Sequence, residues 1–346
     1  MTHRPKKGEF PNDLRLTTVV KPEPRKNEVL IKVVSATITI DDINFAEGAE
    51  LGGIPIAPSP SSKKPFIPGI ELSGVVEEIG PNVTKFNVGD SVFGGSGSPL
   101  KRKGAWAEYC CTKEKILIRK PDYLTHSEAA ACALAGVVAY AAVIQGCNLQ
   151  KRHRILIVGA SGGIGTLAVQ MAIQQGAYVI AVCSKKNKAL VESLGADEVI
   201  DYTSTSFVEA LSKENDNKLD FVVDLVGGKE IEKGSMKVLK RSGTFITIVG
   251  PVRYVGDKLL GWMGIAKLIM YIGWRMFHSQ FKGPKYRFVG ATRATYPFLI
   301  EMFKTHSIKP VIDKTIHFNE KEISEAINYV RTHRATGRVI ISINHT

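Results

Sequence analysis

Two patterns of apolar and polar residues divide the chain near Pro121. Before this residue, short apolar runs alternate with polar residues and glycine turns. Val29 to Val34 (VLIKVV) is a β-branched run that predicts a strand, and Gly74 to Ile79 (GVVEEI) mixes apolar and acidic positions like an antiparallel strand with one solvated face. Asp90 to Phe93 and Gly104 to Cys111 repeat this pattern. The amino-terminal part therefore predicts a compact domain rich in β-strands.

After this point, continuous apolar runs alternate with helical segments. The predicted strands are Arg154 to Gly159, Tyr178 to Cys183, Glu198 to Ile200, Phe221 to Asp224 and Thr244 to Val249, and the predicted helices are His126 to Gly146, Gly163 to Gln175 and Lys186 to Leu194. This alternation indicates a doubly wound parallel sheet. The tail returns to mixed elements, with helices Tyr296 to Thr305 and Glu320 to Thr332 and a strand Arg338 to Ile343. We expect this last strand to rejoin the first domain.

One long apolar segment requires a test for membrane insertion. Leu259 to Phe277 reads LLGWMGIAKLIMYIGWRMF, with Lys267 at its middle and Arg275 near its end. A lysine at the centre of a spanning helix costs roughly 3 kcal/mol. We therefore expect a buried or interface helix, with an amphipathic helix lying on a surface as the alternative.

Composition narrows the class of protein. The chain has 346 residues, 44% of them hydrophobic, and a net charge of +13, which predicts a globular protein of about two domains. A basic surface attracts anionic partners, although a solvated, lysine-rich surface explains the same balance. The five cysteines form no CxxC pair and no apolar leader follows Met1. We expect a reducing compartment, the cytoplasm, with a mitochondrial or peripheral membrane location as alternatives.

The strongest chemical signal is a glycine-rich turn between a predicted strand and a predicted helix. The segment Val158 to Gly165 reads VGASGGIG, a relaxed GxGxxG in which Ala160 takes the place of the first glycine. Gly162 allows close approach of a pyrophosphate, and Gly165 allows the helix to pack tightly on the sheet. The helix N-terminus offers N–H groups to the phosphates. The segment predicts a dinucleotide site formed by Ala160, Ser161, Gly162, Gly163, Ile164 and Gly165.

The end of the second strand bears on the choice between NAD and NADP. An NAD site usually places a carboxylate there. This chain has Cys183, followed by Ser184, Lys185, Lys186, Asn187 and Lys188. A hydroxyl and lysines bind a 2′-phosphate, so the segment favours NADPH, while lysines that simply begin a solvated helix are the alternative.

Ordered motifs along nearly the whole chain resemble those of the medium-chain dehydrogenase/reductases, in their quinone oxidoreductase branch. These motifs are Val29 to Asp42, Pro65 to Gly80, Val88 to Gly94, Gly104 to Tyr109, Ala129 to Tyr140 and Leu194 to Tyr202. The late stretch FKGPKYRFVGA through IKPVID to GRVIISI is similar to the reticulon-interacting mitochondrial oxidoreductases. The resemblance implies an α/β fold with a GroES-like β-rich catalytic domain and a doubly wound Rossmann domain. We expect the GroES-like domain at residues 1–125 and 291–346, and the Rossmann NADP-binding domain at residues 126–290.

Zinc-dependent relatives hold a catalytic metal through cysteine and histidine. The corresponding positions in this sequence are Thr39, Ile70 and Ala131. These side chains cannot hold zinc in a tetrahedral N/S site, and the four-cysteine structural zinc lobe is missing. We therefore expect no metal.

The resemblance implies an NADPH-dependent reductase that transfers hydride to a quinone or an α,β-unsaturated carbonyl. Thr39, Asp42 and Asn44 are the candidates for substrate contact and catalysis, although for Asp42 a structural cap of the following turn explains the residue equally well. Family members are commonly homodimers. The resemblance also implies a set of cofactor contacts, each of which plain packing also explains: Ala135, Val138, Ser184, Lys188, Tyr202, Val226, Gly227, Ile248, Val249 and Arg338.

Two alternative functions remain open at this point. The first is a trans-enoyl thioester reductase, which uses the same cofactor. The second is a non-enzymatic NADPH-binding protein that contacts RNA or an anionic membrane, suggested by the basic runs Lys101 to Lys103 and Lys151 to Arg154. A solvated loop is the preferred explanation for both runs.

Overall fold

The computed structural model describes residues 9–47, 50–51, 54–55, 65–96, 103–212, 218–253, 262–290, 303 and 308–343. The chain divides into two compact units. Unit 1 comprises Met1–Leu134, Leu259–Gly261 and Tyr296–Thr346, and unit 2 comprises Ala135–Lys258 and Trp262–Thr295. The first domain was expected to end at residue 125 and the second at residue 290. In the structure the corresponding limits are Leu134 and Thr295. The assignment of a substrate and a cofactor to the two domains stays a prediction.

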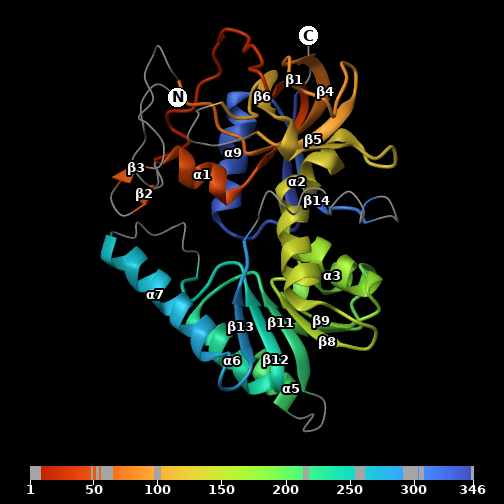
Figure 1. The fold of residues 1–346 in the computed structure, drawn as a ribbon, viewed down its shortest axis with the longest axis vertical. Helices are drawn as coiled ribbons and strands as arrows, with labels where there is room; N and C mark the ends of the chain where they lie inside the picture. The colour runs from red at the N-terminus through yellow and green to blue at the C-terminus, as the bar shows by residue number, and fades with distance from the viewer. Residues whose placement is uncertain are drawn as a thin grey trace. The chain divides into compact units, whose positions relative to one another are not determined.

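Unit 1 is built on a seven-stranded sheet with the order β14-β15-β1-β4-β5-β7, in which β6 also pairs with β1 (Figure 1). The strands are β1 (Glu28–Ile38), β4 (Glu71–Ile79), β5 (Ser91–Gly95), β6 (Tyr109–Lys113), β7 (Leu117–Arg119), β14 (Ile312–His317) and β15 (Arg338–Ser342). β15 pairs antiparallel with β1, with Ser342 opposite Ser35. The prediction that the last strand rejoins the first domain is confirmed. β2 (Glu50–Leu51) and β3 (Ile54–Pro55) form a separate small ladder.

The core of unit 1 lies between this sheet and two helices, α1 (Ile40–Ala46) and α9 (Glu320–Arg331). α9 buries one face because Ile323, Ile327 and Val330 recur at helical spacing. These side chains join the same cluster as apolar residues of β1. α1 follows directly on the carboxyl end of β1, which places its first turn beside the sheet.

Unit 2 contains a six-stranded sheet with the order β10-β9-β8-β11-β12-β13. The strands are β8 (Arg154–Val158), β9 (Tyr178–Cys183), β10 (Glu198–Asp201), β11 (Leu219–Asp224), β12 (Leu239–Thr247) and β13 (Lys285–Phe288), and every pair is parallel. The chain proceeds outward from β8 to β10 and then returns to place β11 on the other side of β8. This is the doubly wound fold that the sequence predicts, and it creates a topological switch point between β8 and β11.

The helices of this part of the chain are α2 (His126–Tyr140) with the π-helical turn η3 (Ala141–Gln145), α3 (Gly165–Gln174), α4 (Lys188–Ser193), α5 (Phe207–Ser212) and α6 (Lys229–Val238). The 3-10 turns are η2 (Glu114–Ile116) and η4 (Lys185–Asn187). The stretch His126–Gln145 is long and apolar enough to cross a membrane, and 67% of its apolar 18-residue window is buried inside the protein. A mostly buried core helix of a globular protein has the same length and composition.

The apolar segment near residue 270 forms helix α7 (Trp262–His278), and none of its residues is buried. The expectation of a helix buried within the chain is therefore wrong, while the interface helix and the surface amphipathic helix stay predictions. The physical reason is that α7 contacts the rest of unit 2 through a narrow face that includes Tyr271 and Arg275, which both bind Glu232. The predicted helix Tyr296 to Thr305 lies outside the described residues, apart from Phe303.

Candidate functional site

The glycine-rich turn folds back onto the end of the neighbouring strand. Gly159 takes a positive φ of 88°, and the backbone N–H groups of Gly159 and Ala160 both donate to the carbonyl of Val182 on β9. A Cβ atom at Gly165 would lie 2.1 Å from the Gly159 carbonyl oxygen. Only glycine allows the helix to begin this close to the turn, as the sequence motif predicts.

Helix α3 starts without a cap. Its N-cap residue, Ile164, makes no side-chain hydrogen bond, and its first turn carries no acidic residue. Within the described residues, the N–H groups of Gly163, Ile164 and Gly165 find no acceptor. Among the described residues, a Cβ at Gly162 would meet only the Gly159 oxygen, at 3.5 Å, so these residues leave the space above the turn open. Free donors, the positive end of a helix dipole and open space fit a pyrophosphate.

The turn lies at the switch point of the sheet, where ligands of doubly wound folds bind. The segments after the other strands end at the same edge, because the carboxyl ends of parallel strands lie on one side of a sheet. The structure thereby brings together five predicted groups of residues. These are the turn Ala160–Gly165, Ser184 after β9, Tyr202 after β10, Val226 and Gly227 after β11, and Ile248 and Val249 after β12.

The rim beyond β9 is polar and basic. Asn187 is buried and donates from Nδ2 to Ser161 Oγ at 2.9 Å, which ties the rim to the glycine-rich turn. The Tyr202 N–H donates to the Cys183 carbonyl, and its ring is 60% exposed. Lys188 is half exposed, and its Nζ lies 3.7 Å from Glu192 Oε1. The carboxylate of Asp201 accepts hydrogen bonds from the N–H and Oγ1 of Thr203. The rim therefore offers hydroxyl and ammonium groups to an anion.

A buried carboxylate holds the loops that follow β11 and β12. Asp224 Oδ1 accepts from the N–H groups of Val226 and Gly227 at 3.0 and 2.8 Å, and Oδ2 accepts from Thr247 Oγ1 at 3.1 Å. Thr247 Oγ1 also accepts from the N–H of Val249. Burial raises the pKa of Asp224 above its ordinary value. One network thus fixes the positions of predicted cofactor contacts on both loops.

Sequence reasoning did not single out Asp224, Thr247 or Asn187 as site residues. The Asp-Leu-Val-Gly-Gly order after β11 is a signal for the first, because an Asp side chain commonly binds backbone N–H groups two residues on. No local signal marks the other two, because their partners lie 23 and 26 residues away along the chain.

The remaining predicted cofactor contacts lie on two other elements. Ala135 is buried and Val138 half-buried on α2. Arg338 begins β15 in unit 1, where its 13%-exposed side chain pairs with the buried carboxylate of Glu71. Burial lowers the pKa of Arg338 to about 10. Glu71 also accepts from Thr37 Oγ1 and the Leu134 N–H. The guanidinium is therefore held by a carboxylate of its own unit, and its contact with a cofactor stays a prediction.

The three candidates for substrate contact lie at the start of α1 in unit 1. Thr39 is the N-cap of the helix and Asp42 completes a capping box. Asp42 Oδ2 accepts from the N–H and Oγ1 of Thr39 at 2.8 and 2.7 Å, while Oδ1 accepts from the Ile70 N–H at 2.8 Å. The capping role considered for Asp42 is confirmed. Burial raises the pKa of Asp42 to about 6. The side chain of Asn44 is half-buried and, within the described chain, has no hydrogen-bond partner.

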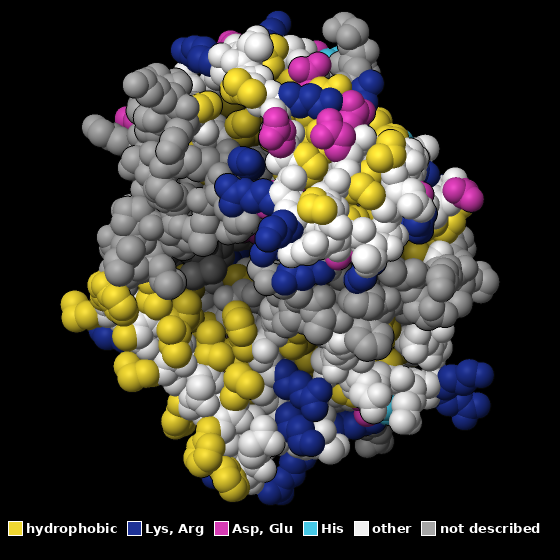
Figure 2. All heavy atoms as spheres, turned by 45° about the horizontal axis from the view of Figure 1, so that its top comes forward, with side chains coloured by type: hydrophobic (Ala, Val, Ile, Leu, Met, Phe, Trp, Pro, Cys, Tyr) yellow, Lys and Arg dark blue, Asp and Glu magenta, His cyan; other side chains and the backbone are white. Residues whose placement is uncertain are grey.

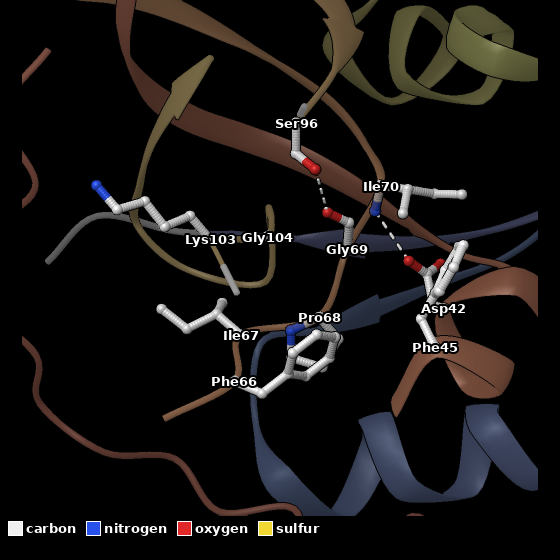
Figure 3. Close-up of a pocket in the computed structure, with 10 residues that line it drawn as sticks. All are labelled: Asp42, Phe45, Phe66, Ile67, Pro68, Gly69, Ile70, Ser96, Lys103 and Gly104. Carbon is white, nitrogen blue, oxygen red and sulfur yellow. Dashed lines mark hydrogen bonds between the residues drawn. The ribbon is translucent and has the colours of Figure 1, made fainter. Parts of the chain in front are cut away.

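Asp42 also borders a small hollow in unit 1 (Figure 3). The hollow has a cavity volume of about 10 Å³, far below the usual volume of a ligand pocket. Its walls are apolar at Phe45, Phe66 and Ile67. Figure 3 shows the Asp42 carboxylate directed to the Ile70 N–H, so this group is already engaged at the edge of the hollow.

The residues at the family's zinc-ligand positions do not fit that metal. The Thr39 hydroxyl is engaged by Asp42, and the side chains of Ile70 and Ala131 carry no donor atom for a metal. Over the described ranges, no group of three or more His, Cys, Asp and Glu residues is placed to hold an ion. Absence of zinc from the active protein stays a prediction.

Known proteins share both units of this chain. The family described as alcohol dehydrogenase GroES-like domain matches residues 25–122, and that described as zinc-binding dehydrogenase matches residues 194–341. The mitochondrial NAD(P)H oxidoreductase RTN4IP1 of Mus musculus is 33% identical over 332 residues, which cover 92% of this chain and 82% of that protein. The 2-methylene-furan-3-one reductase of Solanum lycopersicum is 30% identical over 94% of this chain and 74% of that protein.

A solved structure shows the same architecture. The quinone oxidoreductase from Coxiella burnetii aligns with a TM-score of 0.76 at 25% identity, over 99% of this chain and 98% of that one. The likeness therefore extends over both the seven-stranded and the six-stranded sheet.

Proposed function

This chain belongs to the medium-chain dehydrogenase/reductase family, and from that premise we propose that it is an NADPH-dependent reductase of quinones or α,β-unsaturated carbonyls. Membership makes the chain an NAD(P)H-dependent oxidoreductase. The observation that carries the proposal is the uncapped, glycine-rich start of α3 at the switch point of the parallel sheet. Free N–H groups there fit the two phosphates of a nicotinamide dinucleotide.

The rim of the site supports NADPH over NADH. β9 ends in Cys183, so no carboxylate stands at the position that usually binds the adenosine ribose of NAD. Ser184, Lys188 and Tyr202 supply hydroxyl and ammonium groups around the corresponding place. The contact between Lys188 and Glu192 is solvent-exposed and is worth at most about 0.5 kcal/mol. The ammonium group can therefore turn to a 2′-phosphate at little cost.

A bound nicotinamide supplies the hydride, and the chain must position an acceptor and stabilise the charge that develops on its oxygen. The Thr39 hydroxyl donates to Asp42 and Asp42 is engaged in the capping box. Asn44 is the candidate whose amide stays available. We assign Asn44 as the hydrogen-bond donor to the acceptor carbonyl, and Thr39 and Asp42 as the pair that caps the helix on which it lies. Conjugated acceptors suit this site because they spread the charge without a metal ligand set.

Two further expectations belong to the proposal. The homodimer stays a prediction. The name of the Mus musculus relative describes it as mitochondrial. This supports the mitochondrial location that was the alternative to the cytoplasm.

The test is a cofactor titration with Gly162→Ala. Among the described residues the new methyl group meets one atom, at 3.5 Å, but it occupies the space that a pyrophosphate needs. We expect NADPH affinity to fall at least about tenfold, or 1.4 kcal/mol, with an unchanged unfolding midpoint. Gly273→Ala is the matched control, because a Cβ there meets nothing within 4 Å. Wild-type NADPH affinity in Gly162→Ala would refute the site.

A second titration separates the two cofactors. Lys188→Ala should weaken NADPH about tenfold and leave NADH unchanged, because only NADPH carries the 2′-phosphate. Equal effects on both cofactors would place the phosphate elsewhere. Turnover of the wild-type enzyme with a naphthoquinone, an alkenal and an enoyl thioester then identifies the acceptor, and activity with the thioester alone would favour a trans-enoyl thioester reductase.

A further inference from the structure

Helix α7 presents its apolar side to solvent. The outward residues Trp262, Met263, Ile269, Met270, Trp274 and Phe277 are each more than half exposed. Figure 2 shows hydrophobic side chains gathered over this helix. An ordinary surface helix buries its apolar stripe and exposes its polar one. α7 carries apolar side chains on its outward side as well as on the half-buried side that includes Ile272, so its exposed face is not explained by the packing of unit 2.

The inward side of α7 is anchored by polar contacts. Glu232 on α6 is buried, and its Oε1 accepts from the Tyr271 hydroxyl at 2.9 Å and from Arg275 Nε at 2.6 Å. Ile272 packs against the core cluster of the parallel sheet. These contacts fix the rotation of the helix about its own axis. The apolar side is therefore held outward by the fold.

The apolar surface continues past the end of the helix. The Phe277 and Phe281 rings contact each other with centroids 5.1 Å apart, and the Trp274 ring stacks on His278. Phe281 is 75% exposed. Contiguous apolar patches of more than a few hundred Å² mark sites of protein or membrane interaction.

The charged residues of α7 and of the segment that follows it are all of one sign. From Trp262 to Gly290 the sequence contains no Asp or Glu, and its charged residues are Lys267, Arg275, Lys282, Lys285 and Arg287. All of them except Arg275, which binds Glu232, are exposed. An apolar face with a basic rim complements the anionic headgroups and acyl chains of a lipid bilayer. A second copy would bring two basic rims together, which is unfavourable.

We propose that the outer face of α7 docks unit 2 on an anionic lipid bilayer, with the helix lying in the plane of the headgroups. The helix has 17 residues, about 25 Å at 1.5 Å per residue, and is too short to span the hydrocarbon core. Tyr271 and Arg275 keep it attached to unit 2. Two tryptophans lie along it, and indole rings favour the headgroup region. The docking does not depend on which acceptor the enzyme reduces.

Vesicle flotation of the full chain tests the proposal. We expect binding to vesicles of phosphatidylcholine mixed with phosphatidylserine to exceed binding to phosphatidylcholine alone by at least about tenfold, and to fall as salt rises. Ile269→Glu should lower the binding at least about tenfold. The matched control is Val88→Glu, because Ile269 and Val88 are 64% and 63% exposed and the same charge is introduced. NADPH affinity should be that of the wild type in both variants, which shows that they fold.

Tryptophan fluorescence gives an independent measurement. The chain has three tryptophans, and Trp106 is buried while Trp262 and Trp274 are exposed on α7. Anionic vesicles should shift the emission to shorter wavelength. Absence of vesicle binding, equal binding by Ile269→Glu and Val88→Glu, or an unshifted emission would each overturn the proposal. An oligomer that dissociates in Ile269→Glu, without vesicle binding by the wild type, would assign the face to a second copy instead.

Discussion

Helices α1 and α3 each follow a strand, α1 directly and α3 after the glycine-rich turn, and the sequence predicts a functional site at each. They begin in different ways. α1 opens with a capping box in which Thr39 and Asp42 satisfy each other's backbone N–H groups. α3 opens with Ile164, which caps nothing, and the N–H groups of its first turn find no acceptor in the described chain. The N–H groups at the start of α1 are satisfied by the protein itself, whereas those at the start of α3 are available to a ligand.

The difference shows that a capping side chain stabilises a helix start, whereas free backbone N–H groups leave it able to bind an anion. A free helix start costs stability unless an anion occupies it, and glycine allows that anion to approach. A capping box stabilises the helix and consumes the groups that would otherwise bind a ligand. The candidates in α1 are therefore positioned by their own contacts, and Asn44 is the residue that stays available.

The largest expected effect comes from Gly165→Ala. The new Cβ would lie 2.1 Å from the Gly159 carbonyl oxygen and 2.7 Å from the Ala160 carbonyl carbon. Since both are backbone atoms, the turn or α3 must move, and we expect a loss of more than about 3 kcal/mol in unfolding free energy. NADPH binding should be lost with it. Urea unfolding measures the first effect and fluorescence titration the second; a stable variant that binds NADPH normally would show that α3 does not need its close approach.

The sequence predicts elements whose signal is local. β9 has the predicted bounds, Tyr178–Cys183, because a continuous apolar run ends sharply at polar residues. The glycine-rich turn is likewise visible in its spacing. β14 was not predicted, because IDKTIH is a mixed, half-exposed sequence at an edge of its sheet and its one partner is β15. For α7 the expected burial within the chain was wrong, because an apolar sequence does not show which side of a helix faces the protein; the interface helix stays a prediction.

The site residues follow the same rule. Contacts made by backbone geometry over a few residues, such as the turn before α3, were predictable. The bond between Asp224 and Thr247 and the bond between Asn187 and Ser161 join different strand ends. They exist only once the parallel sheet has brought those ends together, so a single sequence carries no signal of them.

The second largest effect concerns the pH dependence of the capped helix. Burial raises the pKa of Asp42 from 3.8 to about 6. The folded carboxyl therefore binds a proton that the unfolded chain has already lost, and its contribution to stability is present below about pH 4 and is lost as the pH rises through 6. A shift of roughly two units corresponds to about 2 to 3 kcal/mol. Asp42→Asn should remove this dependence.

The measurement is urea unfolding of the wild type and Asp42→Asn at several pH values between about 4 and 7. The stability of the wild type relative to the variant should fall across that range. A constant difference would mean that the carboxyl titrates alike in the folded and unfolded chain. Parallel shifts in NADPH affinity are not expected, because Asp42 belongs to unit 1 and the glycine-rich turn to unit 2.

A smaller effect is expected when a negative charge is placed at the uncapped N-terminus of α3. Ile164→Glu should raise stability by about 0.3 to 1 kcal/mol, since a carboxylate is favourable near a helix N-terminus. It should also weaken NADPH about tenfold through repulsion of the phosphates. Ile164→Gln is the control, because glutamine has the size of glutamate without its charge. It should change both the stability and the NADPH affinity less than Ile164→Glu does. Opposite signs for stability and affinity are the signature of a ligand-dependent helix start; a loss of both would indicate misfolding.

An effect of similar size completes the comparison at α1. Thr39→Val removes the hydroxyl that caps the helix and should lower the unfolding free energy by about 1 kcal/mol, whereas Thr39→Ser keeps the hydroxyl and should retain it. Because the cap serves the fold, kcat/KM with the best acceptor should stay close to the wild-type value in both variants. Asn44→Ala should behave in the opposite way, with unchanged stability and a fall in kcat/KM of about tenfold, since one donor to the acceptor oxygen is lost. If Thr39→Val instead abolishes turnover while Asn44→Ala is silent, the hydroxyl contacts the acceptor, and a capping residue serves the reaction directly.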